Sequence, residues 1–172
     1  AFTVRGGAGL PAYVPQEFEK VFRERFRYVF DTAVQPPRGS SKPEVEMRVF
    51  PPDEPVDLFG HSFTPLVVPH GRINAYGFRV GDLGYITDGK LLPPDTLAAL
   101  DGVKVLVLNA LWFGDPHPTH FNVEEALEAA RAVGAERTYL THLTHRVRHQ
   151  ELLDRLPEGI EPSYDGLTVE IA

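Results

Sequence analysis

The sequence predicts a mixed α/β fold in a single domain that spans residues 1–172. Two observations support this fold class. Strand-like segments dominate the first half of the chain, and strands alternate with helices in the second half, as in layered α/β domains. The chain also has 172 residues, of which 42% are hydrophobic, and this is enough to bury one core.

The first half contains strand patterns, one helix and a loop. Residues 10–15 have a short strand pattern that ends in proline, and residues 16–26 place apolar side chains at helical spacing. Residues 31–43 contain proline, glycine and serine and are predicted to be a loop. Further strands are predicted at residues 44–50, 63–68, 76–80 and 83–86, the last two joined by a tight Gly81-Asp82 turn.

The second half begins with a short helix at residues 95–100, which Pro93-Pro94 opens. A strand follows at residues 103–108. Asn122 and Glu125 match a capping box, so we predict an amphipathic helix that ends at Gly134. The remaining elements are predicted as a strand at residues 137–141, a helix at residues 148–156 and a final strand at residues 167–171.

The composition disfavours several classes of protein. A formal net charge of −7 disfavours a nucleic-acid partner, since polyanions are bound mainly by clustered Lys and Arg. No apolar run reaches the length of a membrane span, and no signal-peptide pattern is present, so we expect no membrane partner. The absence of cysteine predicts a cytoplasmic protein whose metals would be held by His and carboxylate side chains.

Several apolar runs end in residues that can bind a metal through nitrogen or oxygen. Three of them end in His70, Asp88 and His142. A fourth run is followed by a loop that carries His117 and His120, directly ahead of a helix start that favours phosphate. Because strands can deliver polar side chains from their carboxyl ends into one site, this pattern predicts a shared metal centre.

Each of these residues also has an ordinary structural explanation. His70 alone is as consistent with a strand end as with a metal ligand, and Asp88 precedes a glycine, which is typical of a turn. Loop histidines such as His117 are often simply exposed. The pair of His142 and His145 just after a buried strand is harder to explain by packing. The candidate residues share a position after predicted strands, and this agreement favours a metal site.

A divalent ion would explain the combination. Such an ion lowers the pKa of a bound water molecule from about 15.7 to about 7, and in two-metal sites the ions lie roughly 3.5–4 Å apart. Asp88 is the candidate for the bridging ligand, and His70 and His142 are the candidates for terminal ligands. His120 is the candidate for protonating the leaving oxygen, because an imidazole pKa of about 6.5 permits that role.

These motifs together resemble the metallo-β-lactamase superfamily, and more narrowly its phosphoribosyl 1,2-cyclic phosphate phosphodiesterase group. The residues that carry the resemblance are, in order, Val68-Pro69-His70-Gly71, Tyr85-Ile86-Thr87-Asp88, His117-Pro118-Thr119-His120, Tyr139-Leu140-Thr141-His142-Leu143-Thr144-His145 and Tyr164-Asp165-Gly166-Leu167. The resemblance covers nearly the whole chain. It implies the carboxyl-terminal part of a four-layer αββα sandwich.

The resemblance also implies a role for each site residue. His70 and His142 would each bind one of two metal ions, Zn or Mn, with Asp88 as the bridge. Catalysis would rest on Asp88 and on His120, which would lie near the scissile phosphate. The remaining candidates would lie in the second shell or contact the substrate, and they are His117, His145 and Asp165.

The chain departs from the family's pattern in three places. The His-x-His-x-Asp-His motif, which supplies four ligands in the family, is absent from the 172 residues. Because the chain begins with Ala1 and residues 2–7 have the composition of a connection, we expect an N-terminally incomplete domain. Asn109 stands where relatives often carry Asp, and Lys90 stands where small polar residues are commoner. We expect Asn109 to change a second-shell hydrogen bond and Lys90 to change the substrate preference.

The leading hypothesis is a metal-dependent phosphodiesterase that acts on a small cyclic phosphate ester through a metal-bridging hydroxide. The complete protein would hold two divalent ions. One alternative is a non-catalytic remnant or partner-binding module of the same fold, whose exposed apolar surface would favour a homodimer. The other is a thioester or lactam hydrolase with the same metal ligands.

Overall fold

The structure is a computed structural model that describes residues 9–52 and 54–171. It divides into two compact units, one ending at Glu54 and the other beginning at Pro55, and each has its own sheet. The single-domain organisation stays a prediction, and the connection expected at residues 2–7 lies outside the described residues. Among the residues described, no helix is long and apolar enough to cross a membrane.

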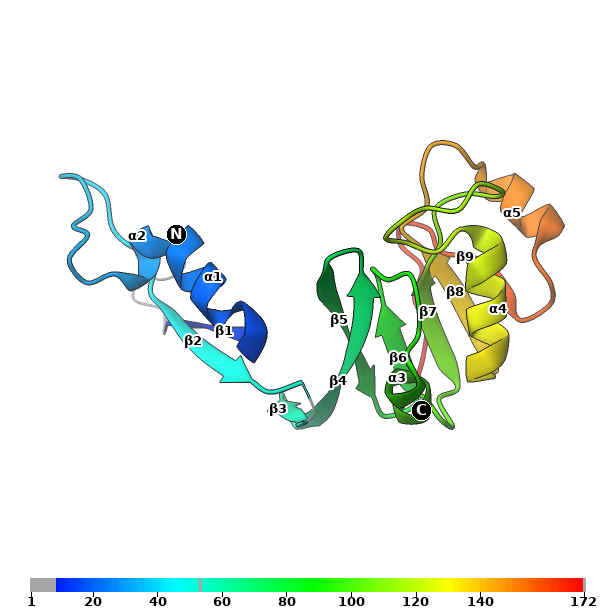
Figure 1. Cartoon of the computed structure of the whole chain (residues 1–172), viewed down its shortest axis with the longest axis horizontal. Helices are drawn as coiled ribbons and strands as arrows, with labels where there is room; N and C mark the ends of the chain where they lie inside the picture. Colours follow the sequence, from blue (N-terminus) through cyan, green and yellow to red (C-terminus); the bar gives the residue numbers. More distant parts are fainter. Residues whose placement is uncertain (1–8, 53, 172) are drawn as a thin grey trace. The chain divides into compact units, whose positions relative to one another are not determined.

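The first unit is built around a parallel pair of strands (Figure 1). Its elements are β1 (Leu10–Pro15), the 3-10 helix η2 (Gln16–Phe18), the helices α1 (Glu19–Arg25) and α2 (Arg27–Phe30), and β2 (Val45–Phe50). The strands and the helix predicted here are confirmed. The Phe22 ring contacts those of Phe26 and Phe30, with centroids 4.7 and 5.8 Å apart. These aromatic contacts hold the turn between α1 and α2.

The second unit contains a mixed sheet with the strand order β3-β4-β5-β6-β7-β8-β9 (Figure 1). The strands are β3 (Val56–Leu58), β4 (His61–His70), β5 (Ile73–Val80), β6 (Leu83–Ile86), β7 (Val105–Asn109), β8 (Arg137–Thr141) and β9 (Ile160–Pro162). Strands β3 to β6 pair antiparallel, and strands β6 to β9 pair parallel. The predicted hairpin is confirmed, because Val80 lies opposite Leu83.

The strand directions bring four strand ends to one edge of this sheet. Strands β4 and β6 both run antiparallel to β5, so they point the same way. Strands β7 and β8 run parallel to β6. The carboxyl ends of β4, β6, β7 and β8 therefore share an edge, the usual location of ligand sites in sheets of parallel strands.

Helices pack on one face of the sheet and close the core. They are α3 (Pro94–Ala99), α4 (Val123–Val133) and α5 (His149–Arg155). Alternate strand residues point to one face, and those on the helix side join a single apolar cluster. In it Ile86 and Leu108 from the strands meet Ala126 of α4 and Leu152 of α5. Burial of this cluster is the main force that holds the strand ends in place.

Helix α4 begins as the sequence predicts. The Asn122 side chain accepts a hydrogen bond from the Glu125 N–H at 2.8 Å, and a Glu125 carboxylate oxygen accepts one from the Asn122 N–H at 3.0 Å. Gly134 ends the helix with φ of +73°. The capping box therefore fixes where the loop that carries His120 meets the helix.

The carboxyl-terminal segment differs from the prediction. Residues 167–171 form no strand, and the last strand of the sheet is β9, which the sequence analysis did not predict. The three apolar side chains of residues 167–171 instead line a hollow of about 300 Å³ beside Tyr85, Val107 and Tyr139 on the sheet face away from the helices. Their alternation reflects packing against that face and not strand pairing.

Candidate metal centre

Four predicted site residues come together at the shared edge. His70 is the last residue of β4, and Asp88 follows β6 after Thr87. His142 comes directly after β8, and His120 lies in the loop between β7 and α4. Because the carboxyl ends of these strands lie side by side, residues far apart in the sequence face one another.

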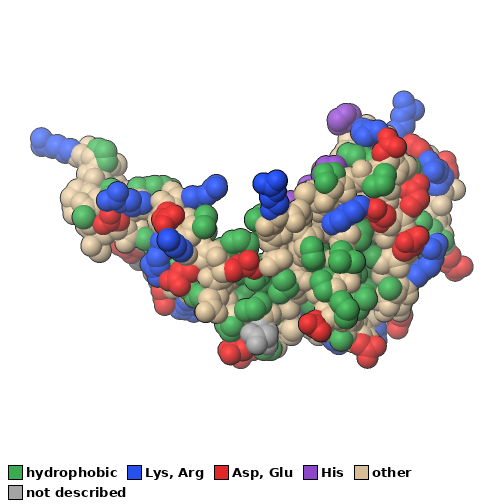
Figure 2. Space-filling view, viewed as in Figure 1, with side chains coloured by type: hydrophobic (Ala, Val, Ile, Leu, Met, Phe, Trp, Pro, Cys, Tyr) green, Lys and Arg blue, Asp and Glu red, His purple; other side chains and the backbone are tan. Residues whose placement is uncertain are grey.

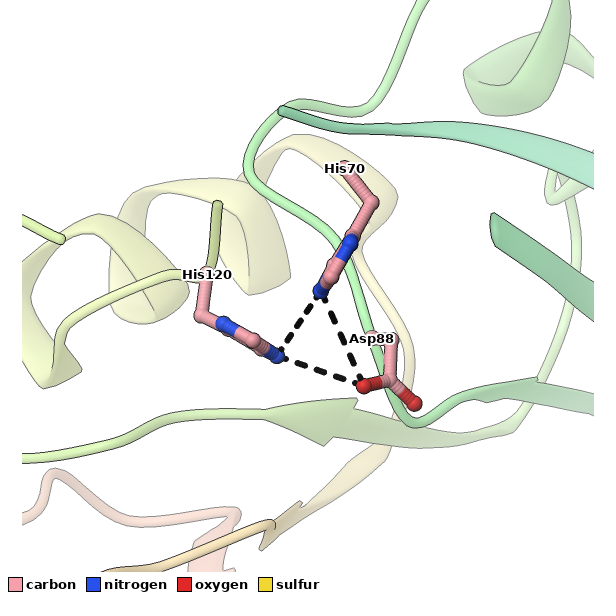
Figure 3. Close-up of side chains that lie close together, drawn as sticks. All are labelled: His70, Asp88 and His120. Carbon is pink, nitrogen blue, oxygen red and sulfur yellow. Dashed lines mark hydrogen bonds and ion pairs between the residues drawn. The ribbon is translucent and has the colours of Figure 1, made fainter. Parts of the chain in front are cut away.

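The four side chains approach through single atoms. His120 Nε2 lies 3.1 Å from His70 Nε2 and 3.1 Å from His142 Nε2. It also lies 3.2 Å from Asp88 Oδ1, and that oxygen is 4.0 Å from His70 and 3.8 Å from His142. Figure 3 shows His70, Asp88 and His120 pointing toward a common centre. The predicted convergence of His70, Asp88 and His142 is confirmed, while their role as ligands stays a prediction.

The protonation of this cluster suits a cation. Burial raises the pKa of Asp88, but a 2.8 Å hydrogen bond from the Thr87 hydroxyl and contact with the imidazoles outweigh it, so this pKa lies below its usual range. Burial lowers the pKa of His120, and together with the neighbouring imidazoles it outweighs the hydrogen bond to Asp88, which raises that pKa. A carboxylate that stays ionised beside imidazole nitrogens is a donor set that divalent metals bind.

The loop around His120 holds the imidazole from its other side. Thr119 Oγ1 lies 2.8 Å from His120 Nδ1, and His117 Nδ1 lies 3.3 Å from the same atom. These contacts occupy Nδ1 and leave Nε2 to face the cluster. Gly71 packs closely here, since a Cβ on it would lie 2.8 Å from Thr119 Cγ2. The turn after His70 therefore interlocks with the loop that carries His120.

The Gly89 carbonyl joins two of the site segments. It accepts a hydrogen bond from the Phe121 N–H at 3.0 Å and another from Asn109 Nδ2 at 3.1 Å. Gly89 follows Asp88, and Phe121 follows His120. One oxygen atom thus fixes the spacing between the carboxylate and the central imidazole, which is the kind of support that metal ligands need from the groups around them.

Main-chain hydrogen bonds connect the other two segments in the same way. The Lys90 N–H donates to the Pro69 carbonyl at 3.0 Å, which links the Asp88 segment to the end of β4. The Ala110 N–H donates to the Thr141 carbonyl at 2.8 Å, next to His142. All four site residues are therefore adjacent to backbone that is hydrogen-bonded to a neighbouring strand end or loop.

His142 has a left-handed backbone. Its φ is +61°, and among the described non-glycine residues only Phe59 shares a positive φ. This conformation costs an L-residue about 1–2 kcal/mol, and such strain persists at functional sites where the surrounding structure enforces it. The chain bends sharply as it leaves β8, and this bend carries the imidazole toward Asp88.

Asn109 contributes a feature that the sequence analysis missed. Its side chain is fully buried, and within the described residues its Oδ1 has no hydrogen-bond partner. An unsatisfied buried acceptor costs about 1–3 kcal/mol. The Asn109 amide does donate to the Gly89 carbonyl, which an ionised Asp could not do. No local signal reveals this contact, because the two residues lie 20 positions apart.

The donor atoms fit a divalent cation. A tetrahedral zinc ion holds its nitrogen ligands at about 2.0–2.1 Å, so neighbouring ligand atoms lie about 3.3 Å apart. The five separations above, from 3.1 to 4.0 Å, lie around that value. Of the four residues, His70, Asp88 and His120 form a group whose donor atoms all lie within 4.8 Å of one another. Imidazole and carboxylate donors suit either Zn or Mn.

Other predicted site residues lie apart from this cluster. His145 and Asp165 are exposed, and in the part of the chain that the structure describes neither forms a hydrogen bond or ion pair with the four residues. Their second-shell role stays a prediction. Lys90 does not point its charge at the cluster, because its ammonium group is paired with both carboxylate oxygens of Glu125 at 2.5 Å.

The helix start after His120, where the sequence suggested a phosphate site, is occupied by its own cap and by acidic side chains. The capping box engages the Glu125 N–H, and Glu124 and Glu125 place two carboxylates in the first turn of α4. Negative charge at this position opposes the attraction that a helix N-terminus offers to an anion.

Comparisons with known proteins identify the family. The model of the beta-lactamase superfamily domain matches residues 1–143. Among solved structures, a new diphosphatase from the PhnP family is similar with a TM-score of 0.82 and 34% sequence identity, over 99% of this chain and 62% of that one. The metallo-β-lactamase fold protein YhfI from Bacillus subtilis is similar with a TM-score of 0.70 and 19% identity, over 96% of this chain and 67% of that one.

One curated relative is named for a transferase activity and not for hydrolysis. It is the octanoyltransferase of Porphyromonas gingivalis (strain ATCC BAA-308 / W83), which is 30% identical over 159 residues, or 92% of this chain and 32% of that protein. The chain thus spans about a third of this relative and 62% of the diphosphatase, whose names describe longer proteins. The family match and the structural similarity show that the chain belongs to the metallo-β-lactamase superfamily.

Proposed function

We propose that this chain contributes the metal centre of a metal-dependent phosphodiesterase. The observation that carries the proposal is the convergence of His70, Asp88, His120 and His142 at one sheet edge. The similarity to a PhnP-family diphosphatase at 34% identity supports hydrolysis at phosphorus. The proposed substrate class is a small phosphate ester, cyclic esters included.

Three residues are proposed to hold the metal. His70 and His142 would each bind an ion, and Asp88, whose Oδ1 is about equally far from both histidines, would be the ligand that two ions share. Divalent ions supply the Lewis acidity that activates water and offsets the negative charge on phosphoryl oxygens. The Thr87 hydroxyl keeps Asp88 ionised and oriented, because it donates to the oxygen that faces away from the cluster.

His120 is proposed to protonate the leaving oxygen. Thr119 and His117 hold its Nδ1, so the proton transfer falls to Nε2, which faces the cluster. A competing assignment makes His120 a further metal ligand, because its Nε2 lies 3.1–3.2 Å from the other three donors, closer than the Asp88 oxygen lies to His70 and His142. The metal content of His120 variants distinguishes these two assignments.

The test uses the full chain, stripped of metal with a chelator and reloaded with Zn²⁺ or Mn²⁺. Hydrolysis of bis(p-nitrophenyl) phosphate is then followed together with bound metal. His70→Ala and His142→Ala should lose metal and activity, whereas His120→Ala should keep its metal and lose about 100-fold or more in kcat. His61→Ala is the matched control, since His61 is an exposed histidine at the opposite end of β4. A wild-type chain that binds no divalent metal would refute the proposal.

A thioester hydrolase is the second candidate function. The observation that favours it is the curated relative, which is named for the transfer of an octanoyl group. The same metal ligands would polarise a thioester carbonyl. Turnover of an octanoyl thioester by the reloaded chain, without turnover of the phosphodiester, would select this candidate.

A further inference from the structure

An ion pair connects two of the segments that form the metal centre. We propose that Lys90 and Glu125 are positioning residues, whose ion pair holds the Asp88 carboxylate at the distance from the His120 imidazole that the metal centre requires. This inference rests on the proposed function, because it needs a metal ion at the cluster. It gives Lys90 a role in metal binding although its ammonium group is paired outside the cluster.

Lys90 belongs to the segment that carries Asp88. It lies two residues after Asp88, and its N–H donates to the Pro69 carbonyl at 3.0 Å, next to His70. Its ammonium nitrogen lies 2.5 Å from both carboxylate oxygens of Glu125. The main chain of Lys90 is thus anchored beside one histidine of the cluster, while its side chain reaches helix α4.

Glu125 belongs to the segment that follows His120. Its carboxylate accepts a hydrogen bond from the Asn122 N–H at 3.0 Å, and Asn122 comes two residues after His120. The same carboxylate accepts from the Lys90 ammonium group. One carboxylate therefore joins the helix start behind His120 to the segment behind Asp88.

A main-chain hydrogen bond spans the same gap beside the ion pair. The Phe121 N–H donates to the Gly89 carbonyl at 3.0 Å. Phe121 follows His120, and Gly89 follows Asp88. One hydrogen bond fixes a distance but lets the two segments rotate about it, whereas two bridges side by side also fix the rotation. The ion pair therefore determines how Asp88 Oδ1 faces His120 Nε2, which lies 3.2 Å away.

The surroundings of the ion pair strengthen it. The Lys90 and Glu125 side chains are only 27% and 31% exposed. They border a hollow of about 310 Å³ whose apolar lining includes Leu92 and Phe121. Figure 2 shows hydrophobic side chains on this face of the second unit, between α3 and α4. Because charges that are partly shielded from water attract each other more strongly than exposed charges, this pair is suited to hold two segments together.

A second lysine pair provides a matched control at the opposite edge of the sheet. Lys104 Nζ lies 2.6 Å from Asp82 Oδ2, and the Lys104 N–H donates to the Asp82 carbonyl at 2.9 Å. Asp82 directly precedes β6 and Lys104 directly precedes β7, so this pair joins the amino ends of the two strands. It combines an ion pair with a main-chain hydrogen bond in the same way, but it lies away from the histidines.

The experiment measures the metal centre and not turnover. The full chain is stripped of metal with a chelator and reloaded with Co²⁺, whose visible absorption depends on the coordination geometry. The Zn²⁺ affinity is measured by competition with the chelator. Lys90→Met and Glu125→Gln should each bind Zn²⁺ about tenfold more weakly and alter the Co²⁺ spectrum. Lys104→Met should keep both the affinity and the spectrum.

Two further variants separate positioning from a general loss of stability. Lys90→Arg should recover most of the Zn²⁺ affinity, because a guanidinium also pairs with both oxygens of a carboxylate. The double variant of Lys90→Met and Glu125→Gln should bind Zn²⁺ no more weakly than the weaker single variant, because both changes remove the same bridge. Glu125→Gln keeps an oxygen that can accept from the Asn122 N–H, so the helix cap survives this change.

Three results would overturn the inference. They are an unchanged Zn²⁺ affinity and Co²⁺ spectrum in both single variants, an equal loss of affinity in Lys104→Met, and losses that add up in the double variant. A wild-type chain that binds metal but hydrolyses no phosphodiester would refute the proposed activity alone, because the same variants still decide the positioning role. A chain that hydrolyses the phosphodiester while both single variants keep the wild-type metal centre would refute the positioning role alone.

Discussion

Gly89 is the position where a single added methyl group should disturb both the core and the metal centre. A Cβ at Gly89 would lie 2.5 Å from Val68 Cγ1 and 3.3 Å from Val68 Cβ, whereas ordinary van der Waals contact begins at 3.4 Å. Val68 is fully buried, so it has no open space to move into. Gly89→Ala must therefore displace either the core strand or the segment that follows Asp88.

The expected cost can be worked out from these contacts. Overpacking of this kind costs about 1–3 kcal/mol, and each of the two hydrogen bonds to the Gly89 carbonyl is worth about 1 kcal/mol if the shift breaks it. Val68→Ala alone should cost about 1.6 kcal/mol in lost apolar transfer, with a further term for the cavity. In the double variant the new methyl group occupies that cavity. Its total cost should therefore be at least about 1 kcal/mol smaller than the sum of the single costs.

Urea unfolding of the wild type, both single variants and the double variant measures this coupling. Metal titration of the same four proteins measures the effect on the site. Gly89→Ala should weaken metal binding by about tenfold, since groups that orient ligands typically have effects of this size, and the double variant should recover part of the loss. Additive unfolding free energies would refute the reasoning, because they would mean that the Gly89 and Val68 positions do not compete for the same space.

Three further predictions concern other features of the second unit, and urea unfolding checks each. Asn109→Asp should lower the free energy of unfolding by about 3 kcal/mol or more, because it buries a charge and removes the donor to the Gly89 carbonyl. Asn109→Ala should lower it by only about 1 kcal/mol. Equal losses in the two variants would contradict the argument that the buried charge is costly. His142→Gly should be up to about 1 kcal/mol more stable than His142→Ala, because glycine adopts a positive φ without strain, and the reverse order would show that the backbone is not strained. Asn122→Ala should lower the stability by about 0.5–2 kcal/mol through loss of the helix cap, and an unchanged unfolding midpoint would count against it.

The positions of the strands and of most site residues could be predicted from the sequence. Apolar runs with polar ends identify strands, and a mixed sheet with parallel members brings their carboxyl ends together. This reasoning predicted that His70, Asp88 and His142 would meet, and the distances confirm it. The capping box at Asn122 and the hairpin at Gly81 were predictable for a related reason, since each depends on residues close in the sequence.

Features that depend on distant contacts could not be predicted. Strand β9 is three residues long and contains Glu and Pro, so its pairing with β8 has no local pattern. The position of His120 depends on the path of a long loop, which the Leu111 N–H to Phe121 carbonyl bond closes. The orphaned Asn109 oxygen and the left-handed backbone of His142 likewise follow from the tertiary structure.

The turns that precede the parallel strands offer attachment points for a reporter. Gly81, Gly102 and Gly134 lead into β6, β7 and β8, all have positive φ, and a Cβ on any of them would meet no atom within 4 Å. These turns lie at the amino ends of the strands, and the histidines lie at the opposite, carboxyl-end edge of the sheet. A cysteine introduced at the exposed residue Asp101 would be the sole thiol of the chain, so a fluorophore coupled there would report unfolding without touching the metal ligands.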